Sequence, residues 1–424
     1  MNVLGIIASG VAALFITVVL AKGARRAALR PPVPYEPGGR APRTRCRAMG
    51  GATVVLGVGT AAGGALWLGA VDGSADPVAG MLAGAAIVAA LGLVHDLKPL
   101  RAALRLAVQW AAAVLVVCLA DLSPAAGALA VLWIVLVTNA FALLDHSDGA
   151  LPAVGIVTAS GLLACAALDG GTGPALLPAA LAAGLIGFLP HSWRPARLHL
   201  GGCGAQFTGF VLASSGALIQ AAAPSGRAAW AALPVLATVA LADAALVVTS
   251  RRRAGRSPLR DADDHIAHRL RRVRVTVPGA AILLALWAGV SVAAGTLVYA
   301  QVLHPALLLV PSAGTVAAVL ALLRIPAYAA RPRPAARRTP TGRTKGATPT
   351  APTPSCTRLA PAASAAPSGP GAPALARPTA VTPAPAPAKP EPIISAPAFT
   401  AAGHPTVPPP PAGRSAAPLA AERS

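Results

Sequence analysis

About eleven apolar stretches, each long enough to cross a bilayer as a helix, fill the first 323 residues of this chain. A transmembrane helix takes about 20 apolar residues, because the hydrocarbon core is about 30 Å thick. Charged residues make up only 12% of the chain and its mean hydropathy is +0.64, too few charges to cover a soluble globular surface. The predicted spans lie near 3–21, 50–70, 77–94, 102–120, 125–144, 150–168, 174–190, 206–223, 228–249, 277–300 and 303–323. The sequence therefore predicts an all-α polytopic membrane protein.

The composition changes near residue 330. Residues 331–424 contain more than half of the 43 prolines of the chain, in runs that are also rich in alanine and threonine. Such a segment cannot bury enough apolar surface to offset the entropy lost on ordering. We therefore expect a multi-span membrane domain over residues 1–330 and a disordered tail over residues 331–424.

Basic residues are concentrated in alternate predicted loops. These loops or their edges carry Lys22, Arg25, Arg26, Arg30, Arg40, Arg43, Arg45, Arg47, Lys98, Arg101, Arg105, Arg194, Arg197 and the arginines from Arg251 to Arg274. The loops between them carry Asp72, Asp76, Asp121 and Asp169, with Arg227 as their only basic residue. Loops rich in lysine and arginine stay in the cytoplasm, which predicts an outside N-terminus and a cytoplasmic tail. The formal net charge of +21 is thus mainly an orientation signal, and nucleic-acid binding is not expected.

Polar residues suited to catalysis gather at the predicted cytoplasmic ends of the spans. They are His95, Asp96, Asn139, Asp145, His146, Asp148, His191, His199, a glycine-rich turn at 201–204, Asp243, Asp261, Asp263, Asp264, His265 and His268. Carboxylates suit a hard cation such as Mg²⁺, and arginines suit phosphates. A cleft at this depth can meet a lipid headgroup from the side and a nucleotide from the cytosol. The inferred reaction class is transfer of a phosphorylated group onto or off a lipid phosphate.

Each of these residues also has a plainer interpretation. Asp145 and Asp148 are three apart and are also explained as loop polarity, and His265 and His268 would simply share a helix face. Asp243 is a stronger candidate, because an idle carboxylate inside a span is costly. A secondary transporter is a weaker hypothesis, since the polar residues lie at one face rather than at mid-depth.

Five segments carry a resemblance to a known family. They are MGG at 49–51, LGLVHDLKPLRAALRLAVQ at 91–109, WIVLVTNAFALLDHSDGALPAVG at 133–155, GFLPHSWRPARLHLGGCGAQFTGF at 187–210 and RRRAGRSPLRDADDHIAHRL at 251–270. In this order they resemble motifs of the polyprenyl-phosphate N-acetylhexosamine-1-phosphate transferases of glycosyltransferase family 4. That family includes undecaprenyl-phosphate GlcNAc-1-phosphate transferases and phospho-N-acetylmuramoyl-pentapeptide transferase.

The resemblance implies a function and a set of site residues. The expected reaction moves an N-acetylhexosamine-1-phosphate from a UDP-amino sugar to polyprenyl phosphate with Mg²⁺, releasing UMP, for cell-wall or envelope polysaccharide synthesis at a bacterial plasma membrane. The loop HIAHRL and the eleven spans favour a UDP-GlcNAc-like donor, and a homodimer is left open. By resemblance, Asp96, Asp145 and Asp148 are catalytic and the last two also hold the metal. Substrate-binding roles fall to Asn139, Arg197, Asp243, His265, His268 and Arg269.

The chain departs from the family motifs at several positions. His95 replaces the first aspartate of a pair, Gly202 replaces the aspartate that is the family's magnesium ligand, and Ala142, Ala205 and Ala267 replace an asparagine, a serine and a histidine. A lost metal ligand removes a large electrostatic contribution to phosphoryl-type transfer. The second hypothesis is therefore a catalytically inactive relative that binds polyprenyl phosphate or a partner enzyme without turnover.

Overall fold

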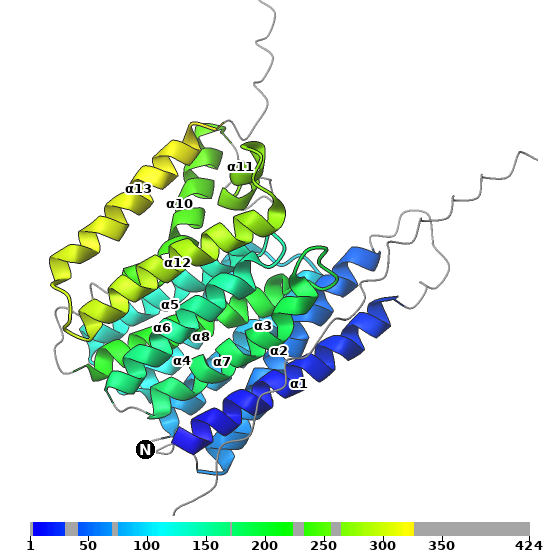
Figure 1. Ribbon diagram of the computed structural model, residues 1–424. Helices are drawn as coiled ribbons and strands as arrows, with labels where there is room; N and C mark the ends of the chain where they lie inside the picture. Colours follow the sequence, from blue (N-terminus) through cyan, green and yellow to red (C-terminus); the bar gives the residue numbers. More distant parts are fainter. Residues whose placement is uncertain are drawn as a thin grey trace, which may run out of the picture. The chain divides into compact units, whose positions relative to one another are not determined.

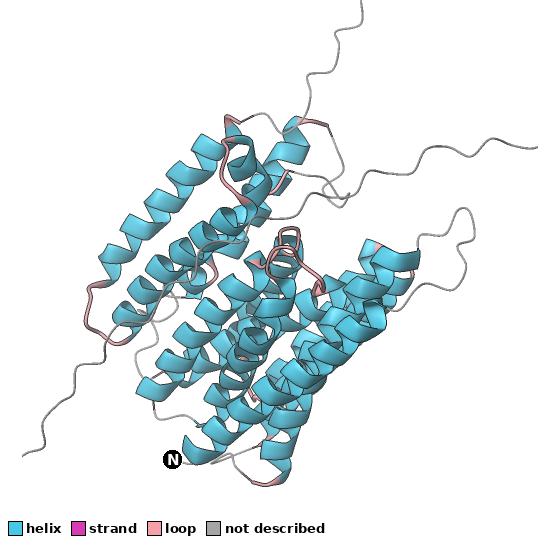
Figure 2. Ribbon diagram, turned by 45° about the vertical axis from the view of Figure 1, so that its right-hand side comes forward, coloured by secondary structure: helices cyan, strands magenta, loops and turns pink. Residues whose placement is uncertain are grey.

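The computed structural model describes residues 3–29, 41–69, 75–169, 172–223, 233–255 and 264–325. The predicted tail at 331–424 lies outside the described residues, as do Asp261 and Asp263. Within the described ranges every regular element is a helix, which confirms the predicted all-α class. Figures 1 and 2 show these helices running side by side in a bundle.

The helices carry the apolar stretches that the sequence analysis identified. They are α1 (Val3–Leu29), α2 (Ala41–Trp67), α3 (Asp76–Leu97), α4 (Ala102–Leu119), α5 (Pro124–Leu144), α6 (Ala150–Leu168), α7 (Thr172–Ser192), α8 (Gly201–Ala222), α10 (Thr238–Arg253), α11 (Ile266–Arg272), α12 (Val277–Tyr299), the short 3₁₀ helix η1 (Pro305–Leu308) and α13 (Leu309–Leu323). Among the described residues, 10 helices are long and apolar enough to cross a membrane. The chain is thus a multi-pass membrane protein.

The ninth predicted span, 228–249, differs from the helix that is observed. Residues 224–232 lie outside the described residues, and α10 is a helix of 16 residues that begins at Thr238. It also continues past the predicted end to Arg253, because Arg251 is buried against Asp264 rather than exposed in a loop. An eleventh crossing of the membrane therefore stays a prediction.

Other boundaries were also predicted wrongly. Helix α2 begins at Ala41, so Arg43, Arg45 and Arg47, which were predicted for the loop before residue 50, lie on its first two turns. Helix α8 begins at Gly201 rather than at 206, so the glycine-rich segment expected to be a turn is the first turn of this helix. Contacts of that turn with other helices, described below, account for the second difference.

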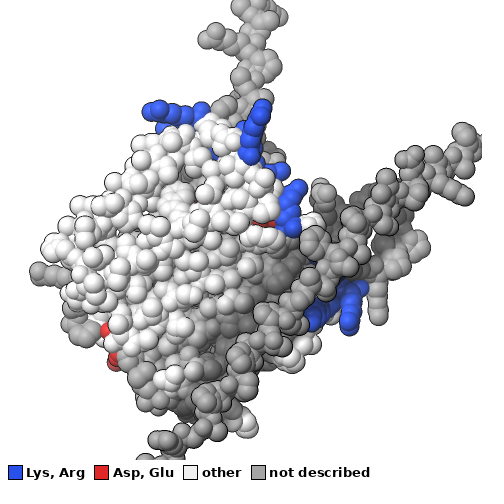
Figure 3. All heavy atoms as spheres, in the orientation of Figure 1, with Lys and Arg blue, Asp and Glu red and all other residues white. Residues whose placement is uncertain are grey.

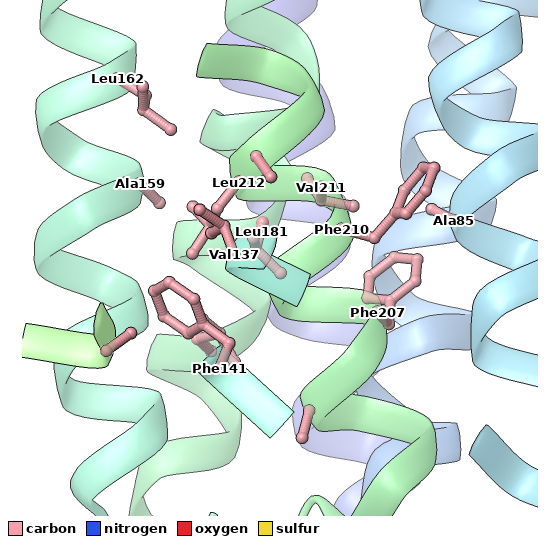
Figure 4. Close-up of a cluster of buried hydrophobic side chains, with 14 of the residues drawn as sticks. Ala85, Val137, Phe141, Ala159, Leu162, Leu181, Phe207, Phe210, Val211 and Leu212 are labelled. Atoms are coloured by element: carbon pink, nitrogen blue, oxygen red, sulfur yellow. The ribbon is translucent and has the colours of Figure 1, made fainter. Parts of the chain in front are cut away.

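Helix α8 lies at the centre of the bundle. It packs against α2, α3, α5, α6 and α7, and nearly all of its residues are buried. Figure 4 shows Phe207 and Phe210 of α8 among side chains of neighbouring helices, including Ala85 and Phe141. A helix that is apolar all round must be surrounded by other helices or by lipid, and here other helices surround it.

The peripheral helices expose large apolar side chains instead. Phe15 of α1, Val290 of α12 and Leu309 of α13 are 67%, 67% and 71% exposed. Extended apolar surface of this kind marks contact with a membrane. These helices therefore face the hydrocarbon core of the bilayer.

The two ends of the bundle differ in charge. On the face shown in Figure 3, lysine and arginine side chains lie toward one end of the helices and most visible acidic ones toward the other. At the acidic end the Tyr299 hydroxyl donates to the Asp169 carboxylate, and it lies 3.4 Å from the carbonyl oxygen of Ile219. These contacts join the ends of α12, α6 and α8. The opposite ends of the same helices form the basic end, where the candidate site lies.

Candidate active site

Two carboxylates from different helices meet at the first turn of α8. The Gly201 N–H donates to Asp145 Oδ2 at 2.7 Å. The next two N–H groups, of Gly202 and Cys203, donate to Asp96 Oδ1 and Oδ2 at 2.9 and 3.1 Å. The first N–H groups of a helix have no partner within the helix and carry partial positive charge. Asp96 at the end of α3 and Asp145 after α5 satisfy three of them, so the structure brings these two predicted residues together.

Glycines allow this convergence. A Cβ added at Gly92 of α3 would lie 2.4 Å from the carbonyl oxygen of Gly202, and one at Gly51 of α2 would lie 2.2 Å from that of Leu200. Gly201 itself has φ +61°, a backbone conformation that favours glycine. Gly51 of the MGG segment and Gly92 thus let the backbones of α2 and α3 approach the first turn of α8.

Substituting alanine for Gly51 is expected to lower the free energy of unfolding by about 1–3 kcal/mol, because backbone atoms that cannot move aside lie where the Cβ would be. Gly59 of the same helix is a matched control, since no atom lies within 4 Å of its added Cβ. Gly59→Ala is expected to be neutral or to stabilise by up to about 1 kcal/mol. Thermal unfolding in detergent, followed by tryptophan fluorescence, measures both, and equal effects of the two variants would contradict the packing account.

A second group joins the turn after α5 to α10 and α11. The ring of His265 stacks on that of His146, with centroids 3.9 Å apart and planes inclined by 15°. His265 Nδ1 lies 2.8 Å from Asp243 Oδ2, and the Ile266 N–H donates to Asp243 Oδ1 at 2.7 Å. His146 Nδ1 lies 2.5 Å from the Leu143 carbonyl oxygen. The structure therefore links Asp243 through His265 to the segment that carries Asp145 and Asp148.

Protein groups explain the burial of Asp243. Its residue is 1% exposed and each carboxylate oxygen has a partner, so the cost of a carboxylate within a helix bundle is offset. An ionised carboxylate only accepts hydrogen bonds, so the His265 Nδ1–H donates to Asp243 Oδ2. The substrate-binding role predicted for Asp243 stays a prediction, and its carboxylate contacts His265 and the Ile266 N–H.

Asp148 and Arg197 lie at the accessible edge of this end. The Asp148 carboxylate is 3.9 Å from Arg194, whose side chain is half exposed. Arg197 is exposed in the connection between α7 and α8. Exposed pairs of this kind contribute little to stability, so these side chains are available for a charged ligand, and their predicted roles stay predictions.

Asn139 belongs to a chain of amides that the sequence analysis did not identify as a whole. Its Nδ2 donates to Gln109 Oε1 at 2.7 Å, and Gln109 Nε2 lies 3.4 Å from Gln206 Oε1. Both glutamines are fully buried and connect α5, α4 and α8. A glutamine within an apolar span is uncommon because its amide needs partners, and this signal could have identified both.

The contacts of Arg269 differ from those expected of a ligand-binding residue. The side chain is 2% exposed, and its guanidinium donates to Ser250 Oγ and to the carbonyl oxygens of Leu322 and Ile325 at 2.6–2.7 Å. Arg269 therefore ties α11 to α10 and to the end of α13. His268, the other predicted residue of this helix, is partly buried with its ring 5.9 Å from that of His265.

His95, which replaces an aspartate of the family motif, contacts α4. Its Nε2 lies 3.2 Å from a guanidinium nitrogen of Arg105, and its Nδ1 lies 3.0 Å from the Leu100 backbone nitrogen. These contacts hold the α3–α4 connection together.

The described residues do not fit a magnesium site. In the described ranges, no three histidine, cysteine, aspartate or glutamate side chains lie close enough together to hold a metal ion. Both oxygens of Asp96 and Oδ2 of Asp145 accept hydrogen bonds from backbone N–H groups, and position 202 has no side chain. Mg²⁺ prefers several oxygen ligands in octahedral geometry, and these residues do not provide them.

Comparison with known proteins identifies the class of protein to which this chain belongs. Residues 78–220, from α3 to α8, match the family described as Glycosyl transferase family 4. The chain is 43% identical over 321 residues to a putative glycosyltransferase of Streptomyces coelicolor, covering 75% of this chain and 76% of the relative. The matched segment carries Asp96, Asp145 and the first turn of α8, whereas Asp243 and His265 lie beyond it. The fold and these matches define a multi-pass membrane glycosyltransferase.

More distant relatives have more specific names. A decaprenyl-phosphate N-acetylglucosaminephosphotransferase of Mycolicibacterium smegmatis is 30% identical over 174 residues, which cover 36% of this chain and 42% of the relative. A probable undecaprenyl-phosphate N-acetylglucosaminyl 1-phosphate transferase of Bacillus subtilis is 30% identical over 145 residues, or 30% of this chain and 40% of the relative. This chain belongs to glycosyl transferase family 4, with the polyprenyl-phosphate sugar-phosphate transferases.

Proposed function

We propose that this protein transfers an N-acetylhexosamine-1-phosphate from a UDP-amino sugar to polyprenyl phosphate and releases UMP, as a step in cell-wall or envelope polysaccharide synthesis. Two relatives are named for N-acetylglucosamine phosphate transfer to decaprenyl or undecaprenyl phosphate. In this reaction an oxygen of the lipid phosphate attacks the β-phosphorus of the UDP-sugar. The bond from that phosphorus to the bridging oxygen breaks, and UMP leaves with the oxygen.

The convergence of Asp96, Asp145, His146 and His265 carries this proposal. They come from three separate parts of the chain and meet at one end of the bundle, through hydrogen bonds to the first turn of α8 and through the stacked rings of His146 and His265. That end lies where helix termini leave the apolar region, so a lipid phosphate can approach from the side and a nucleotide from the aqueous phase. Exposed arginines there, among them Arg194 and Arg197, suit phosphate groups.

The orientation of the protein is part of the proposal. The site lies at the end of the bundle where lysine and arginine gather, which supports a cytoplasmic location for the site and the tail and an outside N-terminus. Single cysteines introduced at exposed Arg197 and exposed Asp121 test this. We expect a membrane-impermeant thiol reagent to label only position 121 in intact cells, and labelling of position 197 alone would reverse the orientation.

A transfer assay tests the reaction. Purified protein in detergent is given polyprenyl phosphate and radiolabelled UDP-N-acetylhexosamines, with and without Mg²⁺, and the label in the lipid fraction is measured. We expect label in the lipid with at least one donor and little with His265→Ala. The matched control is Arg253→Ala, an exposed residue at the end of α10.

A second candidate function is binding of polyprenyl phosphate without turnover. The absent side chain at Gly202 and the engagement of Asp96 and Asp145 with backbone N–H groups favour it. Saturable binding of labelled polyprenyl phosphate, together with no labelled lipid product from any donor, would replace the first proposal by this one.

A further inference from the structure

The carboxylates of Asp96 and Asp145 accept hydrogen bonds from the first turn of α8. Three consecutive N–H groups, of Gly201, Gly202 and Cys203, point at Asp145 and Asp96 over 2.7–3.1 Å. The N-terminus of a helix carries about half a positive charge. Hydrogen bonds from N–H groups to a carboxylate are among the stronger ones in proteins. The negative charge of both carboxylates is therefore compensated from within the protein.

The absence of a side chain at position 202 makes room for the Asp96 carboxylate beside the first turn of α8. A Cβ at Gly202 would lie 2.9 Å from Asp96 Oδ1 and 3.2 Å from the Gly92 carbonyl oxygen. The Asp96 carboxylate thus occupies the space where a side chain at 202 would begin. Any larger residue there requires the Asp96 carboxylate to shift away from position 202.

We propose that in this chain the N-terminus of α8 compensates the charge of Asp96 and Asp145 in place of a divalent cation. Both aspartates are then positioning residues that hold α3 and α5 against α8, and this end of the bundle holds no resident Mg²⁺. The expectation of Mg²⁺ came with the proposed function, but the proposal itself concerns the folded protein and does not depend on turnover.

Metal binding and thermal unfolding test the proposal on the full-length protein in detergent. Mn²⁺ serves as the probe, with electron paramagnetic resonance measuring the free ion. We expect no saturable Mn²⁺ binding by the wild type, and a melting temperature that is the same in Mg²⁺ and in EDTA. Saturable binding by the wild type that is lost in Asp96→Asn would overturn the proposal.

The variants separate capping from metal ligation. Asp96→Asn keeps the shape but weakens two hydrogen bonds, so we expect a melting temperature about 2–5 °C lower, equally in Mg²⁺ and in EDTA. Asp145→Asn, which weakens the hydrogen bond from the Gly201 N–H, gives a shift in the same direction. Asp121→Asn is the control, since Asp121 is exposed in the α4–α5 connection. A loss of stability in Asp96→Asn that appears only when Mg²⁺ is present would contradict capping.

Restoring a carboxylate at position 202 completes the test. Gly202→Asp displaces Asp96 and supplies a further oxygen ligand, so we expect Mn²⁺ binding to appear in this variant. A Gly202→Asp protein as free of metal as the wild type would show that the missing side chain is not what excludes the cation. A wild type without transferase activity would overturn the proposed function and leave these binding results unaffected.

Discussion

Replacing Asp264 by alanine is expected to lower the free energy of unfolding by about 3–5 kcal/mol, because it leaves the Arg251 guanidinium buried without its carboxylate. The two side chains are 0% and 2% exposed, and Arg251 Nε and Nη2 lie 3.0 and 2.9 Å from the Asp264 oxygens. Thermal unfolding in detergent, followed by tryptophan fluorescence, measures the change. Asp264 precedes α11, so we also expect the contacts of Arg269, on that helix, to be lost at a lower temperature than in the wild type.

Neighbouring residues provide the control for this prediction. Arg252 follows Arg251 on α10 but is exposed, so Arg252→Ala is expected to change stability by less than about 0.5 kcal/mol. The double variant Arg251→Met with Asp264→Leu removes the buried guanidinium together with the carboxylate. It is expected to recover much of the lost free energy of unfolding. If Asp264→Ala were as stable as Arg252→Ala, the pair would not hold α10 and α11 together.

Replacing Asp243 by asparagine is expected to reduce sugar-phosphate transfer by about 10²-fold while the protein stays folded. The amide has nearly the shape of the carboxylate but can donate a hydrogen bond to His265 Nδ1. The imidazole then carries its proton on Nε2 instead, so the ring nitrogen that faces away from Asp243 becomes a hydrogen-bond donor. Initial rates at saturating donor and lipid measure the loss, which we expect in kcat more than in KM.

A spectroscopic measurement distinguishes positioning from general destabilisation. The chain has 8 histidines, and ¹⁵N-histidine spectra of the wild type and of His265→Gln assign the resonances of His265. In the wild type we expect the proton on Nδ1, and in Asp243→Asn on Nε2. An unchanged tautomer in Asp243→Asn, or the same loss of activity in the exposed control Arg253→Ala, would contradict a positioning role for Asp243.

The sequence predicts most helices well because each apolar run is long enough to be identified without tertiary information. The spans predicted near 77–94 and 150–168 correspond to Asp76–Leu97 and Ala150–Leu168. The start of α8 was missed because glycine disfavours helix interiors, and three of the four residues at 201–204 are glycine. Contacts from α2, α3 and α5 stabilise this turn as a helix, and no local pattern encodes such contacts.

The candidate site was also predicted only in part. The gathering of these residues at one end of the bundle follows from the sequence, and the contacts of Asp96 and Asp145 with the first turn of α8 and of His146 with His265 confirm it. The partners of each side chain do not. Arg269 contacts carbonyl groups at the end of α13, and Gln109 joins Asn139 to Gln206. By resemblance Asp145 is a metal ligand, whereas its contact with the Gly201 N–H is that of a helix cap.

The amino-acid sequence alone determined that this chain is a helical membrane protein with its reactive side chains at one end and a family of phosphosugar transferases as its relatives. Hydropathy and charge act on each segment separately, so they can be evaluated along the chain. Only the tertiary structure decided that Asp96 and Asp145 accept hydrogen bonds from backbone N–H groups, that Asp243 contacts His265, and that Arg251 and Arg269 are buried. Hydrogen bonds depend on distances of about 3 Å between atoms far apart in sequence, and packing of the helices sets those distances.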